Sequence, residues 1–142
     1  MNIDFAVKGL VIKNNKFLIV HKSDVPGDVW ELPGGRMKFG ETAEQTLVRE
    51  MKEETGYAVL PTKLLDTWNF VSGDLQITGV MYLCRIIDGV FQLSDEHDMF
   101  QWLSLGDKSV EKLAVPFKER MEMWDWELVK STFNKNIGVN NE

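Results

Sequence analysis

The sequence predicts a single domain of the α/β class, and three observations support this prediction. Two pairs of apolar, β-prone segments are each joined by a short turn signal, which is typical of β-hairpins. Between these pairs, a glycine-rich loop leads into a segment with helical periodicity. A second amphipathic segment lies near the C-terminus. With 142 residues, 44% of them hydrophobic, and without repeats or an interdomain linker, the chain is expected to bury one core.

The first predicted hairpin joins two apolar segments, Phe5–Lys13 and Lys16–His21, through an Asn-Asn turn signal. A loop rich in Pro and Gly follows over Ser23–Asp28. A short strand is then expected at Trp30–Leu32, directly before the glycine-rich loop.

The clearest helix is predicted from Thr42 to Thr55. Thr42 is a good N-cap, and Gln45, three residues later, completes the pattern of a capping box. Gly56 is the kind of residue that commonly ends a helix.

The second hairpin is predicted from Lys63–Ser72 and Leu75–Ile87, which a Gly-Asp dipeptide separates. An acidic loop follows at Ser94–Asp98. The last strand is expected at Met99–Leu105, after which strand signals end.

A final helix is expected to begin at Pro116, because proline is favoured in a first helical turn. Its expected core-facing stripe consists of Phe117, Met121, Trp124 and Leu128. Trp126 falls on the opposite face, where it is expected to be either an isolated surface aromatic or a contact for a partner. The domain is expected to span residues 1–133, and the Asn- and Gly-rich residues 134–142 to form a flexible tail.

The composition argues against several classes of partner. A net charge of −6 repels a polyanion, so no long nucleic acid is expected to bind. No segment approaches the roughly 18 apolar residues of a membrane span, and there is no signal-peptide pattern, so a soluble, unprocessed protein without a membrane partner is expected. The one cysteine, Cys84, cannot form an internal disulfide, which favours a reduced cytoplasmic location.

The loop PGGRMKFGET, Pro33–Thr42, contains two glycines with the spacing of a nucleotide phosphate loop. Glu41, however, stands where such a loop needs a lysine. The loop still suits phosphates if divalent cations bridge them to carboxylates of the next helix. Glu41 is then expected to belong to that acidic set or to support it.

Three glutamates of the predicted helix, Glu50, Glu53 and Glu54, lie in a single arc. In projection, Glu54 falls between Ala43 and Leu47, which draws a carboxylate into the apolar face. A buried unpaired carboxylate must become neutral, meet a cation or coordinate a metal, and oxygen ligands suit Mg²⁺ or Mn²⁺. The alternative is a solvated charged face, but the crowding of glutamates on the apolar side argues against it.

These residues resemble the Nudix box, G-x5-E-x7-R-E-U-x-E-E-x-G-U, in which U is a bulky aliphatic residue. The match runs from Gly35 to Tyr57. Its fixed polar and glycine positions are all present, namely Gly35, Glu41, Arg49, Glu50, Glu53, Glu54 and Gly56. Gly35, Glu41, Arg49 and Gly56 are expected to support the site, and Arg49 to pair with the glutamate four residues later.

The resemblance implies an α/β/α sandwich around a mixed β-sheet. It also implies Mg²⁺-dependent hydrolysis of a nucleoside diphosphate linked to another moiety, with Mn²⁺ as a possible substitute. The usual metal ligands of the family correspond here to Glu50 and Glu54, with Glu53 assisting. The carbonyl oxygen of Gly34 is expected to join them.

An acid from a loop outside the box often serves as ligand or base in the family. Glu96 is the matching candidate, and Asp95 and Asp98 are its rivals. Either Glu53 or Glu96 is expected to be the base for the water that attacks one phosphorus of the diphosphate. His97 is a candidate base or ligand, but a solvent-exposed loop histidine is the favoured interpretation.

Candidate substrate-binding residues flank the glycines. Arg36 and Lys38 are candidates for steering phosphates, and Phe39 is a candidate for stacking on a base. Further aromatic candidates, each of which also suits the core, are Trp68, Phe70 and Trp102. The expected substrate is a small nucleotide diphosphate, either a (d)NTP or a nucleotide sugar.

Two alternatives belong to other functional classes. One is a catalytically inactive nucleotide-sensing or interaction module on the same fold. The other is an interaction protein that uses Trp126 and the last helix, and a homodimer is left open.

Overall fold

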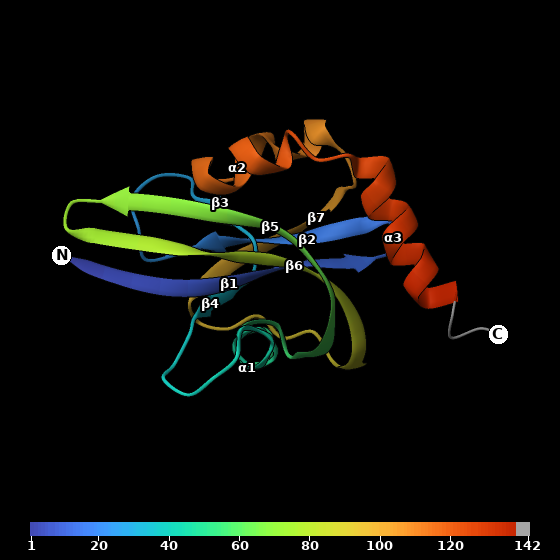
Figure 1. Ribbon diagram of the computed structural model, residues 1–142, viewed down its shortest axis with the longest axis horizontal. Coiled ribbons are helices and arrows are strands. Elements are labelled where there is room, and N and C mark those ends of the chain that lie inside the picture. The colour runs from blue at the N-terminus through green and yellow to red at the C-terminus, as the bar shows by residue number, and fades with distance from the viewer. Residues whose placement is uncertain (139–142) are drawn as a thin grey trace.

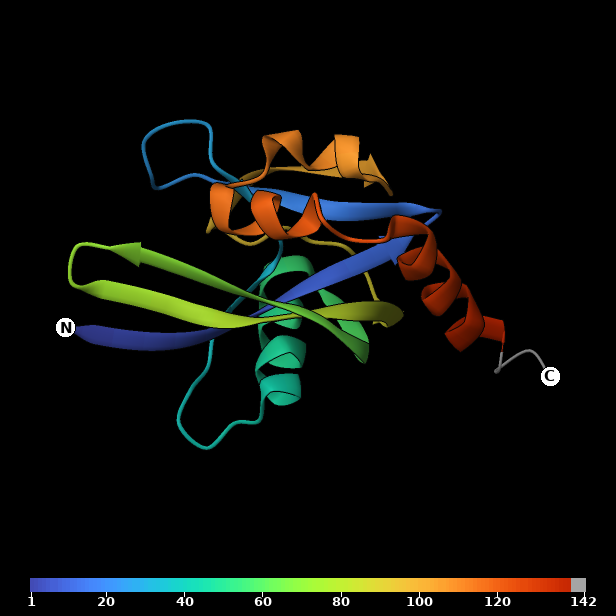
Figure 2. The same cartoon turned by 45° about the horizontal axis from the view of Figure 1, so that its top comes forward.

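A seven-stranded mixed β-sheet forms the centre of the computed structural model, which describes residues 1–138 (Figure 1). Its strands are β1 (Asn2–Lys13), β2 (Lys16–Lys22), β3 (Trp30–Glu31), β4 (Gly34–Arg36), β5 (Tyr57–Ser72), β6 (Leu75–Gly89) and β7 (His97–Ser104). The helical segments are α1 (Ala43–Thr55), the 3₁₀ helix η1 (Asp107–Lys112), α2 (Val115–Met121) and α3 (Trp126–Gly138). Figures 1 and 2 show α1 on one side of the sheet and α2 on the other, which confirms the expected sandwich.

Strand β1 holds the sheet together because it pairs along both of its edges. It runs parallel to β6, from the Asn2–Leu75 pair to the Ile12–Arg85 pair. On its other edge it pairs antiparallel with β4 over Ala6–Lys8 and with β2 near its C-terminal end. The order along the sheet is β3-β2-β1-β6-β5, and β7 pairs with β2. This topology places the glycines of β4 beside the middle of β1.

Both predicted hairpins are confirmed. Asn14 and Asn15 adopt positive φ angles of 53° and 63°, as the tight turn between β1 and β2 requires. Strand β5 begins at Tyr57, directly after α1, rather than at Lys63 as predicted. Register shifts on either side of Pro61 interrupt the alternation of this strand, so its first half carries no clear strand pattern.

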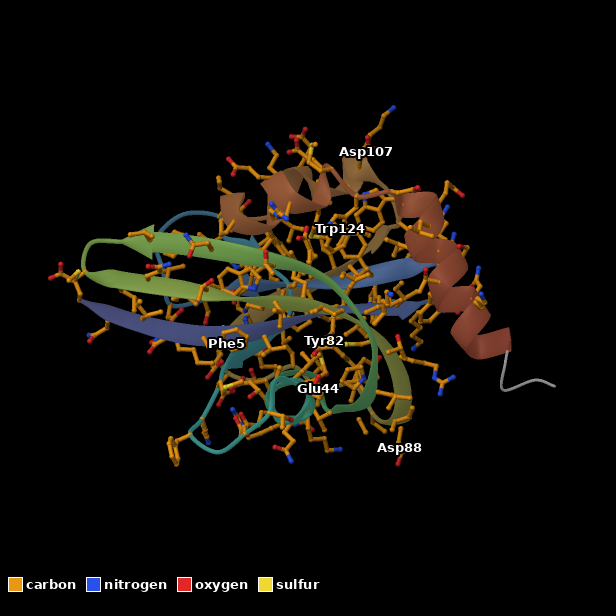
Figure 3. The ribbon with its side chains drawn as sticks, in the orientation of Figure 1. Phe5, Glu44, Tyr82, Asp88, Asp107 and Trp124 are labelled. Carbon is orange, nitrogen blue, oxygen red and sulfur yellow. The ribbon has the colours of Figure 1, made fainter. Side chains whose placement is uncertain are left out.

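Alternate side chains of β1 enter two apolar cores, one on each face of the sheet. Leu10 packs in the core beneath η1, α2 and α3, whereas Val11 packs in the core beneath α1. Figure 3 shows these two layers, with Tyr82 and Glu44 on the α1 side and Trp124 on the other. The helix that carries the candidate metal ligands therefore has a core of its own.

The predicted C-terminal helix is two helices, because the chain leaves the α2 conformation after Met121 and α3 starts at Trp126. The break resets the helical phase, so the expected surface position of Trp126 is wrong. Its ring is 7% exposed and stacks on Phe17, with 5.6 Å between ring centroids, and its Nε1 donates to the Met121 carbonyl at 3.0 Å. Leu128, expected in the core, is 60% exposed.

Helix α3 extends to Gly138, so residues 134–138 of the expected tail are helical. Residues 139–142 lie outside the described residues, and the flexibility of the tail stays a prediction. Within the described part of the chain, none of the helices has both the length and the apolar character needed to cross a membrane.

The burial of Trp126 predicts a large effect on stability. Trp126→Ala should lower the free energy of unfolding by about 3–5 kcal/mol, because it leaves a cavity against Phe17. The matched control on the same helix is Leu128→Ala, which should change the free energy of unfolding by less than about 0.5 kcal/mol because Leu128 is exposed. Urea unfolding measures both, and similar effects for the two variants would contradict this placement.

Candidate active site

Helix α1 begins and ends where the sequence predicts, and this fixes the direction of its glutamates. The Thr42 hydroxyl oxygen accepts a hydrogen bond from the Gln45 N–H at 3.1 Å, and the Gln45 side chain accepts one from the Thr42 N–H at 2.9 Å. Gly56 ends the helix in the left-handed conformation. With Leu47 packed in the core, this helical phase turns Glu54 inward.

The two glycines of β4 let the helix carboxylates lie directly against the backbone. The Gly34 N–H donates to the Glu54 carboxylate at 3.0 Å. A Cβ atom at Gly34 would lie 2.1 Å from the carbonyl oxygen of Val7. A Cβ atom at Gly35 would lie 2.4 Å from the carboxyl carbon of Glu50. A side chain larger than hydrogen at Gly35 would therefore displace the Glu50 carboxylate, and the supporting role of Gly35 stays a prediction.

Arg49 organises the outer part of the acidic set. Its guanidinium donates to both carboxylate oxygens of Glu41, at 2.6 and 2.9 Å, and to Glu50 at 2.8 Å. These hydrogen bonds from Arg49 lower the pKa of Glu41 to about 2. The predicted contact with Glu53 is present but longer, at 3.4 Å, and the Glu53 side chain is 55% exposed. Arg49 thus links Glu41 to Glu50, and the supporting role of Glu41 stays a prediction.

Glu54 is the carboxylate that the fold buries most deeply in this cluster. It is 4% exposed, as its position on the apolar face predicts. Burial raises its pKa to about 7, although the Lys8 ammonium and the Gly34 N–H both favour the ionised form. The carboxyl is therefore close to balance between its neutral and ionised states at neutral pH.

Two buried charges that the sequence reasoning missed lie beside Glu54. The Lys8 ammonium donates to Glu31 at 3.0 Å and to the Gly34 carbonyl at 3.4 Å. Burial opposes ionisation of Glu31, but Lys8 and a hydrogen bond from His97 outweigh it and lower its pKa to about 2. The sequence held one signal, because Lys8 interrupts the otherwise apolar run of residues 5–12.

His97 is buried, so the favoured interpretation of an exposed loop histidine is wrong. It is 6% exposed, and its Nε2 lies 3.1 Å from the Glu31 carboxylate. The reason is tertiary, because His97 begins β7 and this strand pairs with β2, which lies more than 70 positions earlier in the chain at the Lys22–His97 pair. Nothing within the loop sequence indicates that contact.

The loop before β7 brings Glu96 to the cluster. Glu54, Glu96 and His97 each offer one ligand atom, and these atoms all lie within 4.8 Å of one another. Of the rival acids, Asp98 instead lies 2.7 Å from Nδ1 of His21. Glu96 is therefore placed better than Asp98 to act with the helix glutamates.

The residues of this cluster fit a divalent cation, because Glu54 and Glu96 offer the oxygen atoms that Mg²⁺ and Mn²⁺ prefer. Among the described residues, the ligand atoms within 4.8 Å of one another belong to Glu54, Glu96 and His97, so Glu50 lies outside this group. The Glu50 carboxylate accepts from Arg49 at 2.8 Å, and the Gly34 carbonyl accepts from the Lys8 ammonium at 3.4 Å. Gly35 leaves the space that the Glu50 carboxylate fills. A buried carboxyl with a pKa near 7 gains from a cation, because ionisation is otherwise costly there.

The candidate substrate-binding residues lie mainly on the surface. Arg36 pairs with Asp4 at 2.8 Å, and both Lys38 and Phe39 are exposed on the loop before α1. Trp68 is buried against Phe117 in the core, which removes it as a stacking candidate. Of the others, Phe70 is exposed and Trp102 is partly buried. The binding roles of Arg36, Lys38 and Phe39 stay predictions.

Comparisons with known proteins agree with the box and the fold. A family model described as NUDIX domain matches residues 4–125. An ADP-ribose pyrophosphatase of Methanocaldococcus jannaschii is 30% identical over 105 residues, which are 72% of this chain but only 62% of that protein. An RNA pyrophosphohydrolase of Gluconobacter oxydans is 26% identical over 129 residues, which are 89% of this chain and 71% of that protein. The crystal structure of a MutT protein from Methanosarcina mazei superposes with a TM-score of 0.77 at 26% identity, and covers 88% of this chain and 94% of its own.

The raised pKa of Glu54 predicts that the metal-free protein loses stability as pH rises. The carboxyl has a pKa of about 7 when folded and 4.5 in its ordinary state, so the folded state binds the proton more tightly across that window. Glu54→Gln removes the cost of ionisation. It should raise the free energy of unfolding by up to about 3 kcal/mol above pH 7 and change it little below pH 4.5.

Urea unfolding in EDTA at pH 5 and pH 8 measures this difference. At pH 8, Mg²⁺ should make the wild type more stable than Glu54→Gln, because the ion stabilises the wild type but not the variant. A wild type that matches or exceeds the variant in EDTA at pH 8 would show that the carboxyl is not buried at a cost.

Proposed function

Because this chain belongs to the NUDIX domain family, we propose that it is a Mg²⁺-dependent pyrophosphohydrolase that cleaves a nucleoside diphosphate linked to another moiety. The observation that carries the proposal is the buried carboxylate of Glu54, which faces Glu96 and lies beside Glu50 on the same helix. The names of the relatives support the reaction class, since they are described as pyrophosphatases and pyrophosphohydrolases. A (d)NTP or a nucleotide sugar is the proposed type of substrate.

The proposed cation ligands are Glu50, Glu54 and the carbonyl oxygen of Gly34, with Glu96 from the loop before β7. When bound, a divalent cation neutralises charge on phosphoryl oxygens and lowers the pKa of water near it. Arg49 holds Glu50 at 2.8 Å and is itself held by Glu41. This arrangement keeps the ligands in place before the substrate arrives.

Glu53 is the proposed base. It lies on the same helix as the ligands, but its side chain is 55% exposed and its contact with Arg49 is long. Its carboxylate is therefore free to accept a proton from the water that attacks one phosphorus, while the other phosphate leaves. A base in this position typically contributes about 10²- to 10⁴-fold to the rate.

An open hollow of about 710 Å³ lies beside the C-terminal end of α1, and its lining includes Glu53, Gly56, Gly89 and Asp95. Glu53 belongs to this lining, whereas the proposed cation ligands Glu50, Glu54 and Glu96 do not, so the hollow is not assigned to the substrate. Arg36, Lys38 and Phe39 are proposed to contact the substrate from the loop before α1. A cytoplasmic location and a homodimer are retained as proposals.

The proposed reaction predicts turnover in a nucleotide panel. With Mg²⁺, the wild type should cleave at least one of the dNTPs, ADP-ribose, dinucleoside polyphosphates or sugar nucleotides, with products identified by chromatography. Glu54→Gln should lose most turnover because a ligand is missing. Glu53→Gln should lower kcat by about 10²- to 10⁴-fold while the Mg²⁺ affinity changes little.

The matched control is Glu127→Gln, because Glu127 is an exposed glutamate of α3 that pairs with Lys130 across one turn. This variant should hydrolyse at the wild-type rate. Near-normal activity of Glu54→Gln at saturating Mg²⁺ would refute its role as a ligand. A folded, Mg²⁺-binding wild type that cleaves nothing in the panel would favour the inactive nucleotide-sensing module.

A further inference from the structure

His97 has a ring nitrogen that forms no hydrogen bond with the described residues. One of its nitrogens belongs to the group of ligand atoms, within 4.8 Å of one another, that includes Glu54 and Glu96. Its Nε2 is engaged by Glu31 at 3.1 Å. Its Nδ1 has no hydrogen-bond partner among the described residues, although the side chain is 3% exposed. A buried polar atom without a partner costs free energy, so this nitrogen requires an explanation.

The contact with Glu31 determines which nitrogen of a neutral imidazole carries the proton. The Lys8 ammonium lies 3.0 Å from the other oxygen of the Glu31 carboxylate and keeps it ionised. An ionised carboxylate can only accept, so Nε2 of His97 must donate to it. The lone pair of the neutral ring then resides on Nδ1. Carboxylates orient metal-binding histidines in this same way.

We propose that Nδ1 of His97 is a nitrogen ligand for a divalent cation that Glu54 and Glu96 also bind. Glu31 and Lys8 are then positioning residues, because they act on the cation only through the imidazole. The inference rests on the proposed function, which requires a cation at these glutamates.

A nitrogen ligand changes which divalent metal ion the site binds most tightly. Imidazole suits transition metals, whereas Mg²⁺ prefers oxygen and holds its water tightly. The site should therefore favour Mn²⁺ over Mg²⁺ more strongly than a site made only of carboxylates and carbonyl oxygens. A water molecule that donates to Nδ1 is the competing explanation, and it predicts no contact between this nitrogen and a metal.

Pulsed EPR of the Mn²⁺-loaded full-length protein distinguishes these explanations, because it detects nitrogen bonded directly to Mn²⁺. The wild type should show a ¹⁴N coupling, and labelling histidine with ¹⁵N should convert it to the ¹⁵N pattern. The chain contains only two histidines, His21 and His97. His21→Gln is the matched control and should keep the signal, because both ring nitrogens of His21 contact aspartates instead.

Two substitutions of His97 separate its two nitrogens. Glutamine places an amide near the position of Nε2, so His97→Gln keeps the contact with Glu31 but removes the ligand atom. Asparagine places an amide oxygen near the position of Nδ1, so His97→Asn supplies an oxygen ligand in its place. Loss of a group that only orients a ligand already weakens metal binding by about 10- to 100-fold, so His97→Gln should weaken Mn²⁺ binding by at least about tenfold.

Calorimetric titration with Mn²⁺ and Mg²⁺ completes the test. Both variants should lose the ¹⁴N coupling, Mg²⁺ binding should weaken less than Mn²⁺ binding, and His97→Asn should recover part of the affinity. A wild type that binds Mn²⁺ without nitrogen coupling overturns the inference, even if neither variant folds. Hydrolysis by that wild type would leave the proposed function intact, whereas a wild type that shows the nitrogen coupling but cleaves nothing in the nucleotide panel would overturn the proposed function instead.

Discussion

The burial of the Glu54 carboxylate is the constraint on which the rest of the site depends. The fold directs it into the protein because α1 must bury its apolar face, and Glu54 lies on that face. The Gly34 N–H gives it one hydrogen bond, which does not offset the loss of water around a charge. The pKa of this carboxyl therefore rises to about 7, and a cation is the partner that restores its charge.

The positively charged side chains near Glu54 form their hydrogen bonds with other groups, and this explains why they do not neutralise the Glu54 carboxylate. Lys8 donates to Glu31 and to the Gly34 carbonyl, and Arg49 donates chiefly to Glu41 and to its neighbour Glu50. Both residues fix the geometry of oxygen atoms around the site. Lys8 and Arg49 thus hold oxygen atoms in fixed positions around Glu54. This arrangement favours the binding of a divalent ion by Glu54 over a salt bridge between Glu54 and a side chain of the protein.

The structural features that depend on local sequence could be predicted. The capping box at Thr42, the glycine after α1 and the inward phase of Glu54 each depend on residues within one or two helical turns. The structural features that depend on tertiary packing could not be predicted from the sequence. Trp126 is buried, contrary to the prediction, because an irregular segment separates α2 from α3. His97 is buried, contrary to the prediction, because β7 pairs with a strand that lies far away in the sequence.

The most direct measurement is an NMR titration of the Glu54 side-chain carboxyl carbon, assigned by its absence in a Glu54→Gln variant. Without metal, the carboxyl should titrate near pH 7, and saturating Mg²⁺ should move its titration well below that value, because the cation stabilises the ionised form. A carboxyl that titrates near its ordinary value of 4.5 and does not respond to Mg²⁺ would contradict the account.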